Sequence, residues 1–375
     1  MDAALAESLL PWFVLRSVPG VGNLLCKRLV DRFGTAEAVL AAPPEALATV
    51  DGLPERVART IPDHGPSDAV RRELDRLVAS PYQVLTLADP AYPPALREIP
   101  DPPPFLYVHG QLNPSDRAVA LVGSRHPSPY GLRTARSLAA ALSRHDVTVV
   151  SGMARGIDTA AHQGTLDAGG RTVAVLGSGL DKPYPPESRP LLDRIAASGA
   201  VVSEFALQAG PEAHHFPIRN RVISGLSLGT VVVEAAVRSG ALITARLAAE
   251  QGREVFAVPG PIHSGRSAGA HRLLKDGARL VEGVDDILEE LSAHLEATSS
   301  NPKRSVEPVS PPPDLDPDAA RLFLALGEDP VHIDELVRAL SLDPARLMGL
   351  LLELELRGLV AQLPGKRFLR AGSAA

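Results

Sequence analysis

Cysteine is nearly absent from this chain of 375 residues, which contains Cys26 and no other. One cysteine excludes an internal disulfide and a zinc site built from a cysteine cluster. Its scarcity is typical of a reducing compartment, and we expect the protein to work in the cytoplasm. The first segment, MDAALAESLLPWF, also has acidic side chains where a signal peptide needs basic ones.

Aromatic residues, long apolar runs and an excess of basic charge are missing as well. No run approaches the roughly 18 apolar residues that span a bilayer, so we expect no membrane contact. Phe, Trp and Tyr make up 4% of the residues, so a surface that stacks on bases must use few rings. The 38 basic side chains are outnumbered by 44 acidic ones. A nucleic-acid site would therefore have to be a local basic patch.

The pattern of residues 1–75 predicts a small domain of short helices. The stretch SVPGVGNLLCKRLVDRFG places a Pro-Gly turn before a helix that carries Lys27 and Arg28. This arrangement resembles a helix-hairpin-helix turn, whose backbone amides hold a DNA phosphate. A weaker copy follows at 50–61, where Pro54 stands in place of the second glycine. We therefore expect a SAM-like or helix-hairpin-helix domain, and both DNA contact and simple helix packing stay open for it.

Residues 81–296 predict an α/β domain with a doubly wound, Rossmann-like parallel sheet. Continuously apolar strands separated by helices are typical of a parallel sheet that is covered on both faces. The segment before the first of these strands favours one or two extra strands at an edge. The expected strands are 118–123, 147–152, 171–177, 200–205, 230–236, 254–260 and 278–283, and the expected helices are 130–144, 157–168, 186–197, 241–251 and 284–295.

A linker and a third domain follow. Residues 297–316 are rich in Ser and Pro without periodicity, which indicates a linker. Residues 317–375 predict helices at 317–327, 332–340 and 343–357 and then a hairpin, the pattern of a winged helix. Residues 316–375 carry nine acidic and seven basic side chains. A domain that binds in a groove of duplex DNA needs basic residues around it. We therefore expect this domain to contact protein or to have a regulatory role, with Lys366 and Arg367 as the plausible DNA contacts.

Small residues and cations gather where the predicted strands end. In such a sheet, ligands bind outside the carboxyl ends of the strands. Gly and Ser follow most of these strands, and Arg125, Arg155 and Lys182 add positive charge at the same edge. The stretch FPIRNRVISGLS adds Arg219 and Arg221 at a predicted helix start, where anions are favoured. This rim suits a string of phosphates, and the alternative is that these two arginines form ion pairs with Glu204 or Glu234.

Catalytic signatures are weak. Neither G-x-G-x-x-G between a strand and a helix nor a Walker motif occurs, so we expect no dedicated nucleotide cofactor. Asp158 and His162, four residues apart on a helix, could pair as acid and base, but capping and packing are the favoured roles. The adjacent His214 and His215 should point apart and lack metal-ligand spacing. Glu234 lies in a stretch that loosely resembles a loop of nucleotide phosphoribohydrolases, which leaves a nucleotide-processing enzyme as the alternative function.

Seven motifs in order resemble one family, the DNA-processing protein A family, also called DprA or Smf. The match covers the whole central domain, and the flanking segments resemble the accessory domains of the family. The motifs are VGSR (122–125), SGMARGIDTAAH (151–162), VAVLGSGLDKPYP (173–185), SE (203–204), FPIRNRVISGLS (216–227), VVVEAAVRSGALITARLAAEQGREVFAVPG (231–260) and GAHRLLKDGA (269–278).

The resemblance implies a binding protein rather than an enzyme. Family members bind single-stranded DNA without marked sequence preference, protect incoming strands during natural transformation and load a RecA-type recombinase. They act as homodimers through the central domain, and a surface within about 255–295 is the expected contact. The implied DNA-binding residues are Arg125, Arg219 and Arg221 with the neighbours Ser124, Gly152 and Asn220, and Lys182 in the Gly-Leu-Asp loop.

Two further points bear on this implied site. Tyr184 and Phe216 are the nearest candidates for stacking on bases. Glu187 and Ser188 stand where the family often shows Asn, a difference that would alter how the strand is held.

A third function, transcription regulation by the winged helix, would require preference for a specific duplex, and the acidic balance of that domain disfavours it.

Overall fold

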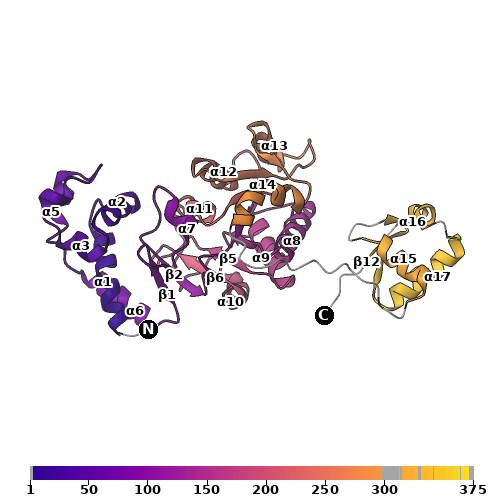
Figure 1. Ribbon diagram of the computed structural model, residues 1–375, viewed down its shortest axis with the longest axis horizontal. Coiled ribbons are helices and arrows are strands. Elements are labelled where there is room, and N and C mark those ends of the chain that lie inside the picture. Colours follow the sequence, from indigo (N-terminus) through magenta and orange to yellow (C-terminus); the bar gives the residue numbers. More distant parts are fainter. Residues whose placement is uncertain are drawn as a thin grey trace. The chain divides into compact units, whose positions relative to one another are not determined.

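The computed structural model describes residues 3–297, 312, 315–327, 331–340, 342–363 and 365–370 (Figure 1). Contacts divide the chain into two compact units, Met1–Ser299 and Ser300–Ala375, and each is described by itself. The linker predicted for 297–316 lies largely outside the described residues. No helix among the described residues is long and apolar enough to cross a bilayer.

The N-terminal region of the first unit is helical, as the sequence predicts. Gly20, at a φ of 95°, takes the left-handed conformation that the turn before α2 requires. Burial raises the pKa of the Cys26 thiol to about 12, so this side chain packs as an apolar group. The helices are α1 (Ala3–Ser17), α2 (Asn23–Phe33), α3 (Ala36–Ala41), α4 (Pro44–Leu47), α5 (Glu55–Thr60) and α6 (Asp68–Val78).

A nine-stranded sheet forms the centre of the first unit, in the order β1-β2-β6-β5-β4-β3-β7-β8-β9. The strands from β6 to β9 in this order pair in parallel, whereas β2 pairs antiparallel with both β1 and β6. The doubly wound sheet and its extra edge strands are thus confirmed. The strands are β1 (Gln83–Thr86), β2 (Phe105–Gly110), β3 (Ala118–Val122), β4 (Thr148–Ser151), β5 (Thr172–Val175), β6 (Ala200–Ser203), β7 (Gly229–Val232), β8 (Glu254–Ala257) and β9 (Arg279–Leu280).

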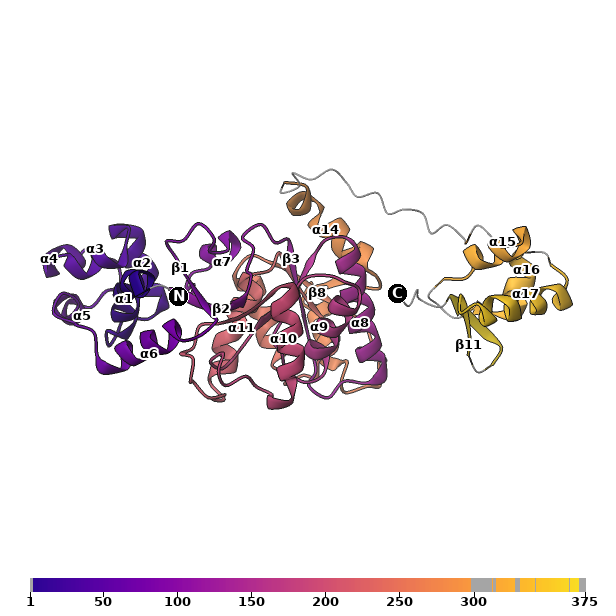
Figure 2. The same ribbon diagram turned by 90° about the horizontal axis from the view of Figure 1, so that it is seen from below.

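Helices cover both faces of the sheet, because the strands have apolar side chains on both faces. Strand β3 is an example. Ala118, Ala120 and Val122 point to a core shared with α11 and α12, whereas Val119 and Leu121 point to one shared with α8, α9 and α14. Helices α8 and α9 pack side by side (Figure 2). The helices are α7 (Pro94–Glu98), α8 (Pro129–Arg144), α9 (Ile157–Asp167), α10 (Arg189–Ser198), α11 (His215–Gly225), α12 (Ala241–Glu250), α13 (Ala268–Lys275) and α14 (Val284–Ala297), with a short 3₁₀ turn at Pro186–Ser188.

The chain changes direction across the sheet at β3. From β3 the strands continue through β4, β5 and β6 on one side, and β7 then returns to the opposite side of β3. The connections that leave β3 and β7 therefore diverge at the carboxyl edge of the sheet. Such a switch point is the usual binding crevice of an open α/β sheet.

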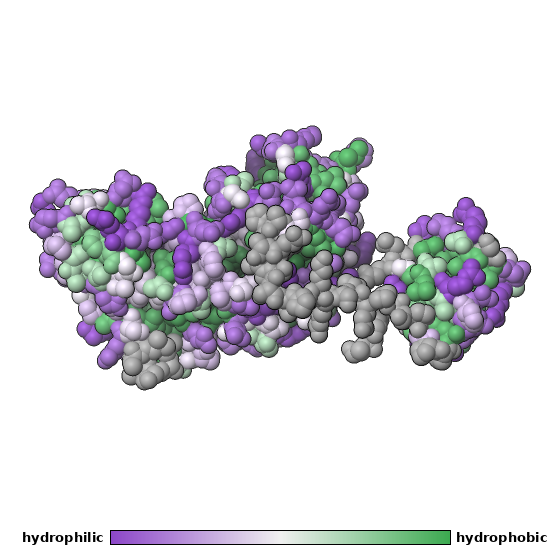
Figure 3. Space-filling model, in the orientation of Figure 1, coloured by the Kyte–Doolittle hydropathy of each residue, from purple (hydrophilic) through white to green (hydrophobic). Residues whose placement is uncertain are grey.

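The second unit is a winged helix, as expected. It holds α15 (Pro317–Ala325), α16 (Ile333–Leu340) and α17 (Pro344–Leu356) beside a sheet in the order β10-β12-β11. The sheet strands are β10 (Val331–His332), β11 (Val360–Leu363) and β12 (Arg367–Arg370), and the sequence analysis missed β10 because it has two residues. Figure 3 shows apolar atoms at the surface of this unit among hydrophilic ones. Large exposed apolar side chains there are Leu324, Met348, Leu352 and Leu356.

Candidate nucleic-acid interface

A cavity of about 600 Å³ opens at the switch point of the sheet. Its walls come from the segments that follow β3 and β7, from the start of α9 and from α11. The sequence predicts an anion-binding site at this same edge, outside the carboxyl ends of the strands. The polar and charged side chains in the wall are Ser124, Arg125, Asp158, Arg219, Asn220, Arg238, Ser239 and Thr244.

The loop after β3 brings Arg125 to the cavity. The backbone N–H of Ser124 donates to the carbonyl of Glu234 at 2.7 Å, which ties the loop to the end of β7. The exposed guanidinium of Arg125 lies over the ring of Phe216, with Cζ 5.2 Å from the ring centroid. No carboxylate within the described ranges forms an ion pair with Arg125, so its charge is available to a ligand.

Arg219 reaches the cavity from α11 and is buried, with 3% of its surface exposed. Its Nη1 donates to the carbonyls of Gly152 and Val175, each at 2.5 Å, and its Nε has no partner in the described structure. Burial lowers the pKa of Arg219 to about 10, against the opposing effect of Asp158, so the side chain remains a cation at neutral pH. A Cβ at Gly152 would collide with this guanidinium, which explains the glycine.

The start of α11 differs from the expectation. The sequence pattern predicts Arg219 and Arg221 at the entrance of this helix, but α11 begins at His215. Pro217 lies within its first turn, where a missing N–H costs nothing. Arg219 therefore stands in the second turn, and the argument from the positive helix end does not apply to it. Its position at the cavity comes instead from the packing of α11 against the end of β5.

Asp158 and His162 do not act on each other. The Asp158 carboxylate accepts from the backbone N–H groups of Gly152 at 3.2 Å and Ala154 at 3.3 Å, and burial raises its pKa. His162 is fully buried, with Nδ1 at 2.7 Å from the Thr172 hydroxyl, and burial lowers its pKa to about 3. The imidazole packs as expected. The carboxylate does not cap α9, because the N-cap is Gly156 without a side-chain hydrogen bond; Asp158 places its charge in the first turn and holds the loop before the helix.

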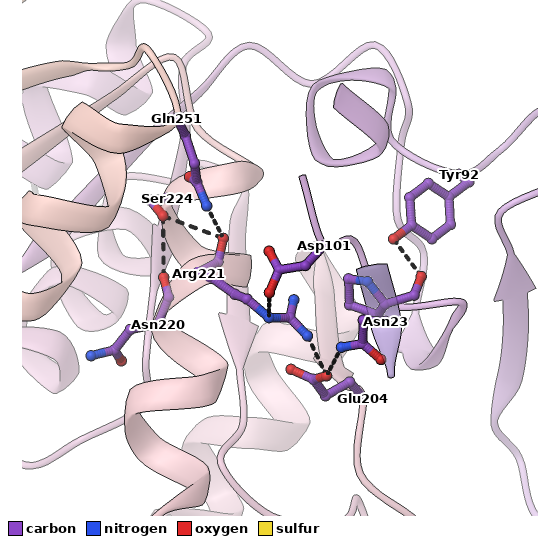
Figure 4. A network of polar contacts seen from close by, with 9 residues as sticks. Asn23, Tyr92, Asp101, Glu204, Asn220, Arg221, Ser224 and Gln251 are labelled. Carbon is purple, nitrogen blue, oxygen red and sulfur yellow. Dashed lines mark hydrogen bonds and ion pairs between the residues drawn. The ribbon is translucent and has the colours of Figure 1, made fainter. Parts of the chain in front are cut away.

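Arg221 lies away from the cavity wall in an ion-pair network (Figure 4). Its Nη2 donates to Glu204 at 2.5 Å and its Nε lies 3.1 Å from Asp101. The alternative of an ion pair with Glu204 therefore has direct support. Asn220, its neighbour, turns to the other side of α11 and lines the cavity, where Nδ2 lies 3.4 Å from the carbonyl of Gly240.

Comparisons with known proteins match this arrangement to one family. The model of the DNA recombination-mediator protein A family matches residues 83–292. Protein Smf of Synechocystis sp. is 36% identical, over 96% of this chain and 98% of that protein. The X-ray structure of DNA processing protein A (DprA) from Streptococcus pneumoniae superposes with a TM-score of 0.65 at 35% identity and covers 75% of this chain and 97% of that one.

The chain belongs to the DNA recombination-mediator protein A family. Its flanks match too, with a SAM-like helix-hairpin-helix tandem at 14–63 and a DprA winged helix domain at 306–366. DNA processing protein A from Helicobacter pylori superposes with a TM-score of 0.52 at 28% identity, over 57% of this chain and 97% of that one. The Helicobacter pylori protein has a single-stranded DNA binding mode described as unique.

In this family member, Lys182 stands outside the cavity wall. It is exposed in the loop after β5, where its backbone N–H donates to the carbonyl of Gly179. Nearby, Arg155 pairs with Glu187 at 2.6 Å and lies over the ring of Tyr184. The Glu187 carboxylate, whose pKa this pairing lowers, neutralises one cation of the predicted rim.

Arg238 is the charged residue of the cavity wall that was not predicted from the sequence. It is exposed in the segment between β7 and α12, and the described residues offer it no ion-pair partner. The signal was present, because this cation follows a strand end at the same edge as Arg125. Ser239 and Gly240 stand beside it and lead into α12, whose positive end also meets the cavity.

Glu234, proposed for the enzyme alternative, is already engaged by protein groups. Its carboxylate accepts from the backbone N–H of Ser128 at 3.0 Å and from the Ser128 hydroxyl at 2.5 Å. It thus holds Ser128, the N-cap residue of α8, is 5% exposed and lies outside the cavity wall. A carboxylate held in this way is poorly placed to attack a nucleotide.

The first hairpin of the helical region packs on the sheet domain. Asn23, at the start of α2, donates to Glu204 at 3.1 Å, and Lys27 donates to the carbonyl of Ile99 at 3.2 Å. Arg28 turns to Asp51 in the second hairpin. The side chains expected to approach DNA are therefore used inside the first unit, which favours the packing alternative.

Proposed function

We propose that this chain binds single-stranded DNA without marked sequence preference at the carboxyl edge of its central sheet. We also propose that it protects incoming strands during natural transformation in the cytoplasm and loads a RecA-type recombinase onto them. Family membership and the single-stranded DNA binding of the Helicobacter pylori relative support this function. Binding, rather than catalysis, is its proposed activity, with homodimers formed within about 255–295.

One observation carries the proposal. Arg125 and Arg219, from segments far apart in the sequence, meet at one cavity of about 600 Å³. Arg125 is exposed and lacks an ion-pair partner among the described residues, while Arg219 is held rigidly by two carbonyls. An exposed arginine without an ion pair, Arg125, can follow the phosphates of a flexible strand, while Arg219 offers a second cation at a fixed position.

Two other residues refine the contact. Asp158 is buried in the same wall and offsets the charge of the buried Arg219, so the exposed cations of the wall attract an anion more strongly. Arg125 and Arg238 are exposed, and we assign the phosphates to these two side chains together with Arg219, with Ser124 and Asn220 in the same wall. Gly152 does not line the cavity, but its carbonyl holds Arg219. Lys182 and Arg221 remain proposed contacts that the cavity does not include.

The first test is binding of a labelled oligothymidine and of a duplex of equal length across a salt series. We expect single-strand preference and an affinity that falls steeply with salt, because bound phosphates release counterions. Arg125→Ala should weaken binding about 10- to 100-fold, as for a lost charge-assisted hydrogen bond. Arg246→Ala removes an exposed arginine of α12 that lies outside the cavity wall and serves as the matched control.

Two results would contradict the proposal. One is equal affinity for single strand and duplex with no effect of Arg125→Ala. The other is release of free base from nucleoside monophosphates, which would move the nucleotide-processing alternative forward. Recombinase loading is a separate measurement, in which the chain should shorten the lag before a RecA-type filament forms on coated single strands.

A further inference from the structure

Two adjacent histidines and a glutamate converge just before and at the start of α11. Glu212, His214 and His215 offer ligand atoms that all lie within 4.8 Å of one another. The prediction that the two histidines point apart is wrong, because their ring centroids are 4.5 Å apart at an interplanar angle of 67°. The backbone turns into the helix between them, which brings both rings to one side. Within the described ranges this is the one group of three such side chains so close together.

The ring of His215 is held in place before any ion binds. It stacks on Phe205 with centroids 4.0 Å apart and planes 25° apart. Its Nδ1 lies 3.2 Å from the carbonyl of Gly210, and because a carbonyl only accepts, Nδ1 carries the hydrogen. Nε2 therefore keeps its lone pair. A backbone carbonyl on one ring nitrogen is the usual support for a histidine that binds metal through the other.

The other two side chains are exposed and can adjust. His214 Nδ1 lies 3.4 Å from Glu212 Oε2, and both side chains have more than half of their surface exposed. Around a tetrahedral zinc ion, ligand atoms stand about 3.4 Å apart. A modest rotation of His214 and Glu212 toward the fixed His215 ring would bring the three ligand atoms to that spacing.

We propose that Glu212, His214 and His215 form a binding site for a divalent transition metal ion, with Zn²⁺ as the best match. Two imidazoles and one carboxylate favour zinc over magnesium or calcium, which prefer oxygen ligands. Three protein ligands leave a fourth position for water. The site joins the loop after β6 to the first turn of α11, directly before Phe216. Metal binding would stabilise this segment of the folded chain.

The test uses the full-length chain without a histidine tag, treated with a chelator and then dialysed. Titration with zinc chloride by calorimetry should show one ion per chain, and Co²⁺ should give the absorption of a tetrahedral site. His214→Ala and Glu212→Gln should each weaken zinc binding at least tenfold and abolish the rise in thermal midpoint that zinc causes. His263→Ala is the matched control, because His263 is exposed and lies outside the group.

Each outcome decides the matter. Saturable zinc binding by the wild type and by His263→Ala, lost in the two variants, establishes the site. Absence of saturable binding by the wild type, or equal binding by His214→Ala, overturns it. Both variants change exposed side chains, so the result does not depend on whether His215→Ala folds. No DNA is present, so this test is independent of the proposed DNA binding.

Discussion

The guanidinium of Arg125 and the ring of Phe216 face each other at the mouth of the cavity, 5.2 Å apart. The first comes from the loop after β3 and the second from the first turn of α11. Their contact places a cation and an aromatic face within reach of one nucleotide, so phosphate and base can be bound together.

Phe216→Leu should weaken single-stranded DNA binding about tenfold, because a base that stacks on an aromatic ring gains about 1–3 kcal/mol. The leucine keeps the apolar contact, so the free energy of unfolding should change little. Combined with Arg125→Ala in a double-mutant cycle, the two effects should not add, since the side chains are in contact. Phe33→Leu in α2 is the control, and an equal loss of affinity there would refute a specific role for Phe216.

Gly152→Ala should lower the free energy of unfolding by about 1–3 kcal/mol, as for an overpacked core. The new methyl group would meet the Arg219 guanidinium, which is buried and cannot move aside freely. Urea denaturation measures the loss. Gly65→Ala is the comparison, because no atom lies within 4 Å of a Cβ built there. If both variants were equally stable, Arg219 would be less rigidly held than its contacts indicate.

Much of the fold was predictable because its strands are continuously apolar and its helices are periodic. The position of the cavity was predictable as far as its wall follows strand ends, and Arg125 does lie in that wall. The predictions that were wrong concerned the start of α11 and the directions of side chains, which depend on three-dimensional packing. The sequence shows that Arg219 and Arg221 are two residues apart, but not that α11 turns one toward the cavity and the other toward Glu204. The approach of His214 to His215 depends on the local turn into the helix in the same way.

The stability of the chain should fall as pH drops below neutral, in part because of His162. Its pKa is lowered to about 3 in the folded state, whereas in the unfolded chain it is near 6.5. Between these values the unfolded state binds the extra proton, so stability is complete above about 6.5 and declines toward 3. The slope for one group is at most about 1.4 kcal/mol per pH unit.

Urea denaturation of the wild type and of His162→Gln between pH 7 and 5 checks this expectation. The variant lacks the titrating imidazole, so its stability should depend less steeply on pH over that range. Asp158 acts in the opposite direction, because burial raises its pKa and the folded state therefore takes up this proton more readily than the unfolded one. Both proteins contain Asp158, so the difference between their slopes reports on His162. Identical slopes for the two proteins would show that His162 is hydrated or protonated in the folded chain.

Arg221→Met should destabilise the chain by about 3–5 kcal/mol, because the Glu204 side chain, which is 7% exposed, would lose its charged partner and keep only the amide of Asn23. The double variant Arg221→Met/Glu204→Gln should recover much of this loss. DNA affinity per folded molecule should fall far less than in Arg125→Ala, measured at a temperature where both proteins are folded. A loss of affinity as large as for Arg125→Ala would instead make Arg221 a DNA contact equal in weight to Arg125.

Glu73, on α6, accepts a hydrogen bond from the Tyr107 hydroxyl at 2.9 Å and one from the backbone N–H of Leu207 at 2.6 Å. One buried carboxylate thus joins the helical region to β2 and to the loop after β6. A chain shortened to begin at residue 81 would leave both donors without their acceptor and uncover the apolar surface beneath α6. The helical region and the sheet domain therefore form one cooperative folding unit, and we expect them to unfold in a single thermal transition.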